Sequence, residues 1–134
     1  GAAGIEALSR GAPAATFVEK DGKTCAVIGA NLRRAKLGGG NVVRADVSNY
    51  LREAIRATTA QFTAVVLDPP YGEPQLLLAS LEALADAERG LLASEAIVVA
   101  KHFWRDDLTE VVGNLVKSRQ KRFGETMLTF YTRN

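Results

Sequence analysis

The feature that most constrains the fold is a set of four short apolar runs, separated by longer segments whose apolar residues have helical spacing. The runs are residues 15–18, 41–44, 62–67 and 96–100. Each is too short for a typical helix and rich in β-branched side chains, so each predicts a strand. Because the runs lack regular polar alternation, we expect strands buried on both faces, as in a parallel sheet. Strands alternating with helices predict an α/β fold with right-handed crossovers.

The segments between these runs predict helices, and the C-terminal segment predicts a hairpin. We expect one helix from its cap at Asp21 to about residue 36, ended by the glycines at 38–40, which tolerate a left-handed backbone. Ser48 is expected to cap the next helix, and residues 75–85 place their leucines on one face of a third. Residues 115–123 and 126–132 predict an antiparallel hairpin that closes one edge of the sheet.

Length and composition narrow the class of protein. A chain of 134 residues suits one domain, and its apolar content of 47% is that of an ordinary globular protein. The lone Cys25 excludes an intrachain disulfide and a cysteine-based zinc site. No apolar run approaches the roughly 20 residues that cross a bilayer, and no signal peptide is visible, so we expect a cytoplasmic protein. The net charge of +2 is too small to indicate nucleic-acid binding, which local clusters must support.

The sharpest chemical signal is the tetrapeptide Asp68-Pro69-Pro70-Tyr71, directly after the third apolar run. Ligands of open α/β sheets bind beyond the carboxyl ends of strands, where this segment is expected. The prolines fix the backbone, so that the Pro69 carbonyl and the Asp68 carboxylate offer two acceptors beside the flat ring of Tyr71. This set suits a planar molecule with an exocyclic amino group. The alternative is a strand-ending turn with Tyr71 packed on the surface.

A strand that ends in Asp-Pro-Pro-Tyr is the signature of amino-group methyltransferases that use S-adenosylmethionine, and other segments resemble that superfamily in the right order. Residues 1–12 are similar to the second half of the superfamily's glycine-rich first motif. Residues 18–21 are similar to the end of its second strand, and residues 44–47 to the end of its third. The closing pattern is residues 119–126 followed by residues 128–131. Over residues 1–134 the chain resembles the RsmD type, the 16S ribosomal RNA guanine-N2 methyltransferases. The resemblance implies a Rossmann-like class I methyltransferase domain whose mostly parallel sheet ends in an antiparallel hairpin.

The resemblance also implies roles for single residues. Asp68, Pro69, Pro70 and Tyr71 would hold the target amino group, and the S-adenosylmethionine site would include Gly1, Gly4, Glu19, Lys20, Asp46 and Val47. Glu19 would accept from the ribose hydroxyls and Asp46 from the adenine amino group. On the residues alone, Glu19 also suits a charged surface turn, and Asp46 also suits a helix cap. No metal is expected, because a sulfonium methyl is already activated.

Basic residues of the predicted hairpin form a candidate RNA surface. Lys117, Arg119 and Lys121 are expected on one face of a strand, and with Arg122 and Lys101 they are the candidate substrate-binding residues. The alternative is an edge strand protected by charge against aggregation. His102 suits a packed or solvated residue better than a catalytic base, and Trp104 suits either a base-stacking platform or a loop anchor.

Two departures from the family pattern qualify these expectations. First, Ala100 and Lys101 stand where the family's strand usually ends in Glu. Second, the chain opens inside the first motif. For this second reason we expect the first strand to be missing and the 134 residues alone to be inactive. The expected partner is 16S ribosomal RNA or the assembling small ribosomal subunit, met by a monomer without a membrane. DNA adenine-N6 or cytosine-N4 methylation, and a non-catalytic RNA-binding or assembly module, remain the alternatives.

Overall fold

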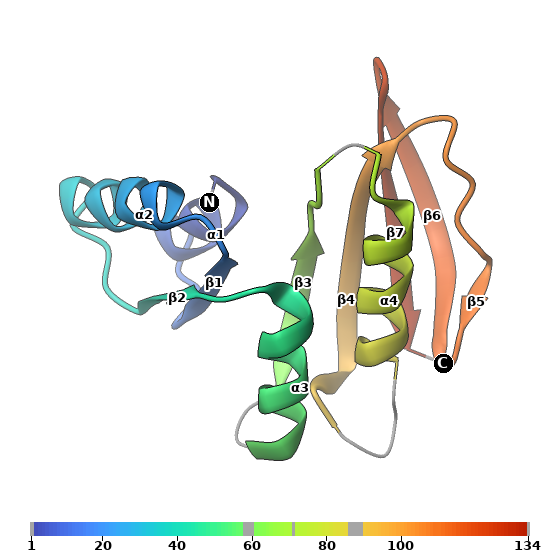
Figure 1. Cartoon of the computed structure of the whole chain (residues 1–134), viewed down its shortest axis with the longest axis horizontal. Coiled ribbons are helices and arrows are strands. Elements are labelled where there is room, and N and C mark those ends of the chain that lie inside the picture. Colours follow the sequence, from blue (N-terminus) through green and yellow to red (C-terminus); the bar gives the residue numbers. More distant parts are fainter. Residues whose placement is uncertain (1, 58–60, 71, 86–89, 134) are drawn as a thin grey trace. The chain divides into compact units, whose positions relative to one another are not determined.

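The computed structural model describes residues 2–57, 61–70, 72–85 and 90–133. The chain divides into two compact units, Gly1–Tyr50 and Leu51–Asn134. Helix α3 (Val47–Ala57) begins in the first unit and ends in the second (Figure 1). Each unit has its own sheet, so each is considered by itself.

The first unit is a βαβ arrangement preceded by a helix. Its elements are α1 (Ala2–Ser9), β1 (Ala15–Glu19), α2 (Gly22–Arg34) and β2 (Gly40–Arg44). Strands β1 and β2 pair in parallel, from Ala15 opposite Gly40 to Glu19 opposite Arg44. The core consists of Leu8, Phe17, Ile28 and Leu32. Both predicted strands and the predicted helix are confirmed, and Asp21 caps that helix by accepting from the Thr24 N–H.

Two of the predicted helix boundaries are wrong. Helix α2 ends at Arg34, and the left-handed residue after it is Lys36, with φ of 57°, not the glycine triplet. Gly39 also has a positive φ, of 82°, and a Cβ there would lie 2.4 Å from the Pro13 carbonyl oxygen, so both the backbone and the close approach favour glycine. Helix α3 is capped by Asp46 and not by Ser48: the Asp46 carboxylate accepts from the Ser48 N–H at 2.9 Å. The Asp46 carboxylate lies two residues before Ser48 and accepts from the free N–H groups of Ser48 and Asn49 at the start of the helix.

The second unit contains a five-stranded mixed sheet. Its elements are β3 (Phe62–Leu67), α4 (Pro74–Leu84), β4 (Leu92–Phe103), β5 (Val111–Val112), β6 (Leu115–Phe123) and β7 (Thr126–Arg133). The strand order is β3-β4-β7-β6-β5; β3 and β4 are parallel, and the other pairs are antiparallel. The α/β class and the C-terminal hairpin are therefore confirmed (Figure 1).

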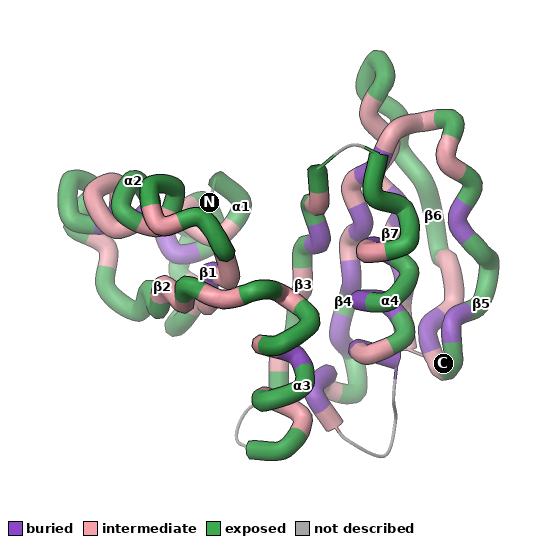
Figure 2. Tube along the Cα trace, in the orientation of Figure 1, coloured by how far each residue is buried: buried purple, intermediate pink, exposed green. Residues whose placement is uncertain are grey.

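Along β4 of the second unit, buried residues alternate with more exposed ones (Figure 2). Val98 and Ala100 of β4 are fully buried on the face that α4 contacts. Val66 and Ile97, on the other face of the same sheet, are 49% and 44% exposed. The expectation of strands buried on both faces is thus wrong for β3, where Leu67 alone is buried among residues 62–67. Apolar composition favours a strand but does not determine how many of its faces are covered.

Tyr131 connects β7 to the loop before β5, and it gives a test of this core. Its side chain is fully buried, and its hydroxyl donates to the Thr109 carbonyl at 2.8 Å. Burial raises the pKa of Tyr131 above its usual value, and the charges of Glu110 and Asp107 raise it further. The folded state therefore favours the protonated phenol.

Tyr131→Phe is expected to lower the free energy of unfolding by about 1 kcal/mol at pH 7, because the Thr109 carbonyl loses its donor. As the pH rises above about 10, the original chain loses stability that the variant does not, so the difference between them shrinks. Urea unfolding at neutral and alkaline pH measures both effects. Tyr50→Phe is the matched control, and a pH-independent difference for Tyr131→Phe would contradict the account.

Candidate functional site

The predicted amino-group site lies at the carboxyl ends of two parallel strands. Leu67 of β3 is opposite Ala100 of β4, so Asp68 and Lys101 follow at neighbouring positions on the same edge of the sheet. A surface pocket opens beside them. Its lining residues are Pro69, Pro70, Gly72, Glu73, Pro74, Leu77, Lys101, His102, Phe103 and Asp106. The diproline segment therefore borders a hollow at the sheet edge, as expected. Tyr71 lies outside the described residues.

Asp68 is held by a cation. Its carboxylate oxygen is 3.6 Å from the Lys101 ammonium, with the side chains 57% and 42% exposed. An ion pair this open to water contributes little free energy, so an incoming amino group can replace the ammonium. Lys101 had been expected to bind substrate; in this structure it lies against the proposed acceptor. The chain thus has Lys where the family pattern has Glu, and that Lys is beside Asp68.

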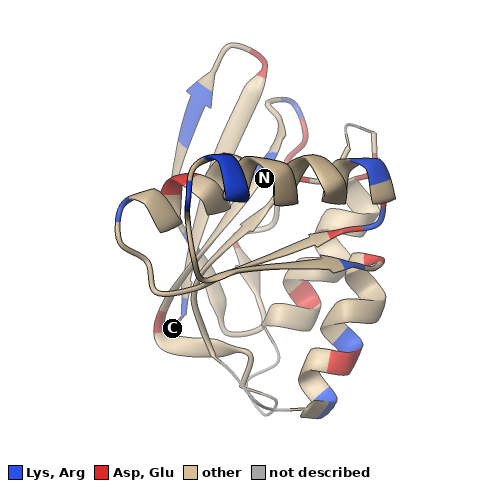
Figure 3. Cartoon of the chain, turned by 90° about the vertical axis from the view of Figure 1, so that its left-hand side faces the viewer, with Lys and Arg blue, Asp and Glu red and all other residues tan. Residues whose placement is uncertain are grey.

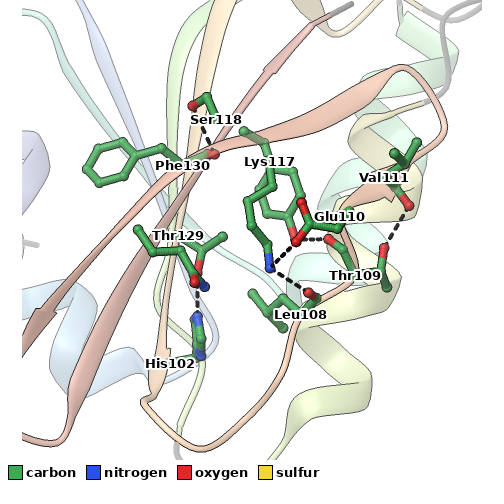
Figure 4. Close-up of polar contacts among 11 residues, drawn as sticks. His102, Leu108, Thr109, Glu110, Val111, Lys117, Ser118, Thr129 and Phe130 are labelled. Atoms are coloured by element: carbon green, nitrogen blue, oxygen red, sulfur yellow. Dashed lines mark hydrogen bonds and ion pairs between the residues drawn. The ribbon is translucent and has the colours of Figure 1, made fainter.

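His102 forms part of the pocket wall but both of its ring nitrogens are occupied. The side chain is buried, with Nδ1 2.9 Å from the Phe103 carbonyl and Nε2 2.7 Å from the Thr129 hydroxyl (Figure 4). The same hydroxyl oxygen accepts from the Gln120 side-chain amide at 2.8 Å. This agrees with the interpretation of His102 as a packed residue. The chain of contacts joins β4, β7 and β6 directly behind the pocket.

The residues expected at the cofactor site lie at the ends of β1 and β2. Glu19 and Arg44 are the last paired residues of the two strands, so Lys20 and the Asp46-Val47 pair follow at one edge of that sheet. One Glu19 carboxylate oxygen accepts from the Asp21 N–H at 3.2 Å. One Asp46 oxygen accepts from the start of α3. Both local alternatives, the turn and the cap, are therefore present, and each carboxylate keeps a second oxygen for a ligand.

Gly4 has a structural explanation that sequence reasoning did not provide. It lies within α1, and a Cβ at this position would be 2.3 Å from the ring of Phe17 in β1. The glycine thus allows the helix to pack closely on the strand. Its predicted contact with a cofactor is a separate matter that stays a prediction. Gly1 lies outside the described residues.

The prediction that Lys117 shares a face with Arg119 and Lys121 is wrong. A register shift between Lys117 and Arg119 places Lys117 opposite Tyr131, whereas Arg119 is opposite Phe130 on the other face. The Lys117 side chain is only 10% exposed, and its ammonium donates to the Leu108 carbonyl at 2.8 Å and pairs with Glu110 at 3.4 Å (Figure 4). It anchors the loop before β5, and one inserted residue in a strand reverses the face of all later residues.

The other basic residues of β6 are exposed. Arg119, Lys121 and Arg122 lie toward the hairpin turn, where Figure 3 shows Lys and Arg along the end of the strand. Each lies over an aromatic ring: Phe130, Phe123 and Trp104, respectively. These three cations are exposed, and their predicted role in binding RNA stays a prediction.

Sequence reasoning missed two acidic residues in the pocket wall, Glu73 and Asp106. A signal for Asp106 was available, because it closely follows the carboxyl end of β4 at Phe103. Within the ranges that the structure describes, no three or more His, Cys, Asp or Glu residues gather as a metal site. None of the described helices is long and apolar enough to cross a membrane.

Comparison with known proteins agrees with this architecture. Residues 1–132 match the family model described as Conserved hypothetical protein 95. The chain is 36% identical over 132 residues to the "Putative rRNA methyltransferase YlbH" of Bacillus subtilis, covering 98% of this chain and 70% of that protein. It is 31% identical over 133 residues to the Ribosomal RNA small subunit methyltransferase D of Escherichia coli K12, covering 99% of this chain and 64% of that protein.

A solved structure gives the same result for the fold. The one titled "Putative methyltransferase yhhF from Escherichia coli" superposes with a TM-score of 0.81 at 28% identity, covering 99% of this chain and 70% of that one. The expected Rossmann-like class I methyltransferase fold is thereby confirmed. The site described above occupies the strand ends that bind ligands in such sheets.

Proposed function

The chain belongs to the Conserved hypothetical protein 95 family, the RsmD family of ribosomal RNA methyltransferases, and from that premise we propose that it transfers a methyl group from S-adenosylmethionine to the N2 amino group of a guanine in 16S ribosomal RNA. The observation that carries the proposal is the Asp68-Pro69-Pro70 segment, which ends β3 beside a pocket. The partner is 16S ribosomal RNA or the assembling small subunit, and the protein acts as a monomer in the cytoplasm.

The chemistry follows from the amino group. A guanine amino group is a weak nucleophile, because its lone pair is delocalised into the ring. The two N–H groups of the guanine donate hydrogen bonds to the Asp68 carboxylate and the Pro69 carbonyl, which turns the nitrogen lone pair out of conjugation with the ring. Tyr71 stacks on the base. These acceptors bind more strongly as positive charge develops on the nitrogen, so they stabilise the transition state more than the ground state. Alignment of the two reactants supplies the rest of the acceleration. The new nitrogen–carbon bond would replace the methyl–sulfur bond, the sulfur would leave as a neutral thioether, and the methylated nitrogen would release one proton to solvent.

The cofactor residues fit the chemistry of S-adenosylmethionine. Carboxylates such as Glu19 and Asp46 suit ribose hydroxyls and an adenine amino group, and each has an oxygen outside the local contacts described above. We assign Glu19 and its neighbour Lys20 to the ribose end of the site, and Asp46 with the Val47 backbone to the adenine. The backbone of Gly1 and Gly4 is assigned to the methionine portion of the cofactor. When bound, S-adenosylmethionine supplies an activated methyl group.

The decisive experiment follows methyl transfer to three substrates. We expect the longest natural form of the chain, incubated with radiolabelled S-adenosylmethionine, to label naked 16S RNA or assembled small subunits, with the label recovered as N2-methylguanine. Label in duplex DNA alone would favour adenine-N6 or cytosine-N4 methylation. RNA binding without transfer to any of the three would favour the non-catalytic module.

We also propose that residues 1–134 form one methyltransferase domain whose strand β1 takes a further neighbour that the described residues do not supply. Strand β1 pairs with β2 on one side, and β3 pairs with β4 on one side; across the described residues neither has a second neighbour. The curated relatives are longer than the part this chain spans. A strand paired with the open edge of β1 would extend the floor of the cofactor site, because Glu19 ends β1.

The 134-residue chain is therefore expected to bind S-adenosylmethionine with an affinity weaker than micromolar, and to transfer no methyl group. Isothermal calorimetry measures the binding, with a longer form that includes upstream residues as the comparison. Weak binding by the short chain and tight binding by the long one would support the proposal. Micromolar affinity in the short chain would contradict it, because the cofactor site would then be complete without the added strand.

A further inference from the structure

The β6–β7 hairpin presents fixed positive charge on both of its faces. The register shift at Ser118 places Arg119 and Lys121 opposite Phe130 and Leu128, on one face. Arg122 is opposite Met127 and therefore lies on the other face. Because Lys117 is buried against its own loop, it adds nothing to either surface. The exposed charge is thus divided between the two faces.

Arg122 and Arg105 share one aromatic ring. The Arg122 guanidinium carbon lies 3.7 Å from the Trp104 ring centroid, and that of Arg105 lies 4.8 Å from it. Arg122 Nε also donates to the Gly124 carbonyl in the hairpin turn, at 2.7 Å. Across the described residues, neither guanidinium has a carboxylate within ion-pair distance. Two positive groups are thereby held together without a counter-charge.

The opposite face repeats this arrangement with other aromatic rings. Arg119 lies 4.6 Å from the Phe130 ring, and Lys121 lies 5.1 Å from the Phe123 ring. Phe123 is 53% exposed, so its ring is covered by a cation more than by the protein core. Stacking on a ring limits the rotamers of a long cationic side chain, which lowers the entropy lost when the side chain binds an anion.

The location of the hairpin links one of its faces to the pocket. In Figure 1 the β6–β7 turn extends past the ends of β3 and β4. Trp104 and Arg105 lie in the chain between Phe103 and Asp106, both of which line the pocket. The Trp104 N–H also donates to the Glu125 carbonyl of the turn, which ties the pocket rim to the hairpin. The Arg105–Arg122 face is therefore the pocket side, and the Arg119–Lys121 face is the far side.

We propose that this hairpin inserts between two phosphate backbones of a folded RNA, with one basic face on each backbone. At physiological salt the Debye length is about 8 Å, so cations that face away from a single strand gain little from it. Charge fixed on both faces is best used where phosphates lie on both sides, as in a groove or helical junction. The pocket-side face would then hold the segment that carries the target base. This inference rests on the proposed function, since it takes RNA as the substrate.

The test compares the salt dependence of RNA binding by three double variants. Arg119→Gln with Lys121→Gln removes the far-side charges, Arg105→Gln with Arg122→Gln removes the pocket-side charges, and Lys23→Gln with Arg34→Gln removes two exposed charges of α2 as a matched control. Fluorescence anisotropy gives the affinity for a 16S RNA fragment that contains a helical junction, and for an unstructured oligouridine of equal length. Thermal melting verifies that each variant folds.

On the junction RNA, each hairpin variant is expected to reduce the slope of log affinity against log salt by about 1 to 2, while the control leaves it unchanged. On oligouridine, one hairpin variant at most should change the slope. Equal effects of the two variants on both RNAs, or a slope change from one face alone on the junction RNA, would overturn the proposal. If the Gln variants do not fold, Arg105→Lys with Arg122→Lys provides the test, because it keeps the charge and should retain the slope.

These measurements do not depend on methyl transfer. If the chain labels DNA and not RNA, the proposed function fails whatever the salt slopes are. If the chain methylates 16S RNA but only one face of the hairpin, or neither, contributes to the salt slope of RNA binding, the proposed function stands and the two-backbone arrangement is wrong.

Discussion

In the longest natural form of the chain, Asp68→Ala is expected to lower methyl transfer to 16S RNA by at least about 10²-fold, while leaving RNA affinity and the melting temperature unchanged. The Asp68 side chain is 57% exposed, and its ion pair with Lys101 is open to water, so its removal costs little stability. What is lost is the acceptor that strengthens as charge develops on the amino nitrogen. Single-turnover transfer of a radiolabelled methyl group measures the effect.

Two further variants sharpen this test. Asp68→Asn keeps one acceptor oxygen but loses the negative charge, so its rate should lie between that of the original chain and that of Asp68→Ala. Glu82→Ala removes an exposed carboxylate from α4 and serves as the control for charge and folding. Transfer by Asp68→Ala at the original rate would mean that the carboxylate does not hold the amino group, and the proposed mechanism would be wrong.

The strands and the hairpin were predictable because they depend on local composition. Residues 62–67 and 115–123 are strands at the predicted bounds. The first is rich in β-branched residues, and the second ends at the Gly124-Glu125 turn that joins it to the next strand, so both signals are local. The end of α2 and the cap of α3 were not predictable in the same way. Several residues near each boundary could have served, and the geometry of the backbone selected Lys36 and Asp46.

The position of a site residue was predictable where a sequence motif fixes the backbone. It was less predictable where a side chain has several possible partners. The diproline segment had one place to lie, at the end of β3. Lys117 was misplaced because the register shift at Ser118 leaves no signal in an otherwise regular strand pattern. The pairing of Lys101 with Asp68 depends on the alignment of two strands that are distant in sequence, and alternation along either strand does not reveal it.

Thr129 is the junction of the polar contacts behind the pocket. The Phe103 carbonyl can only accept, so the Nδ1 of His102 must carry the proton in that contact. In the tautomer whose only ring proton is on Nδ1, Nε2 accepts from the Thr129 hydroxyl, whose oxygen in turn accepts from Gln120. Both Thr129 and His102 are buried, so water cannot replace a missing hydroxyl between them.

Thr129→Val is therefore expected to lower the free energy of unfolding by about 2 kcal/mol, although the two side chains are close in shape. The loss arises because Nε2 of His102 remains buried without a donor, whereas exposed Gln120 can turn to water. Thr132→Val, on the opposite face of β7, is the matched control and should be neutral or slightly stabilising. Urea unfolding of both variants at pH 7 measures the difference. Equal changes in the two would show that the loss of a strand hydroxyl, and not the orphaned imidazole, determines the effect.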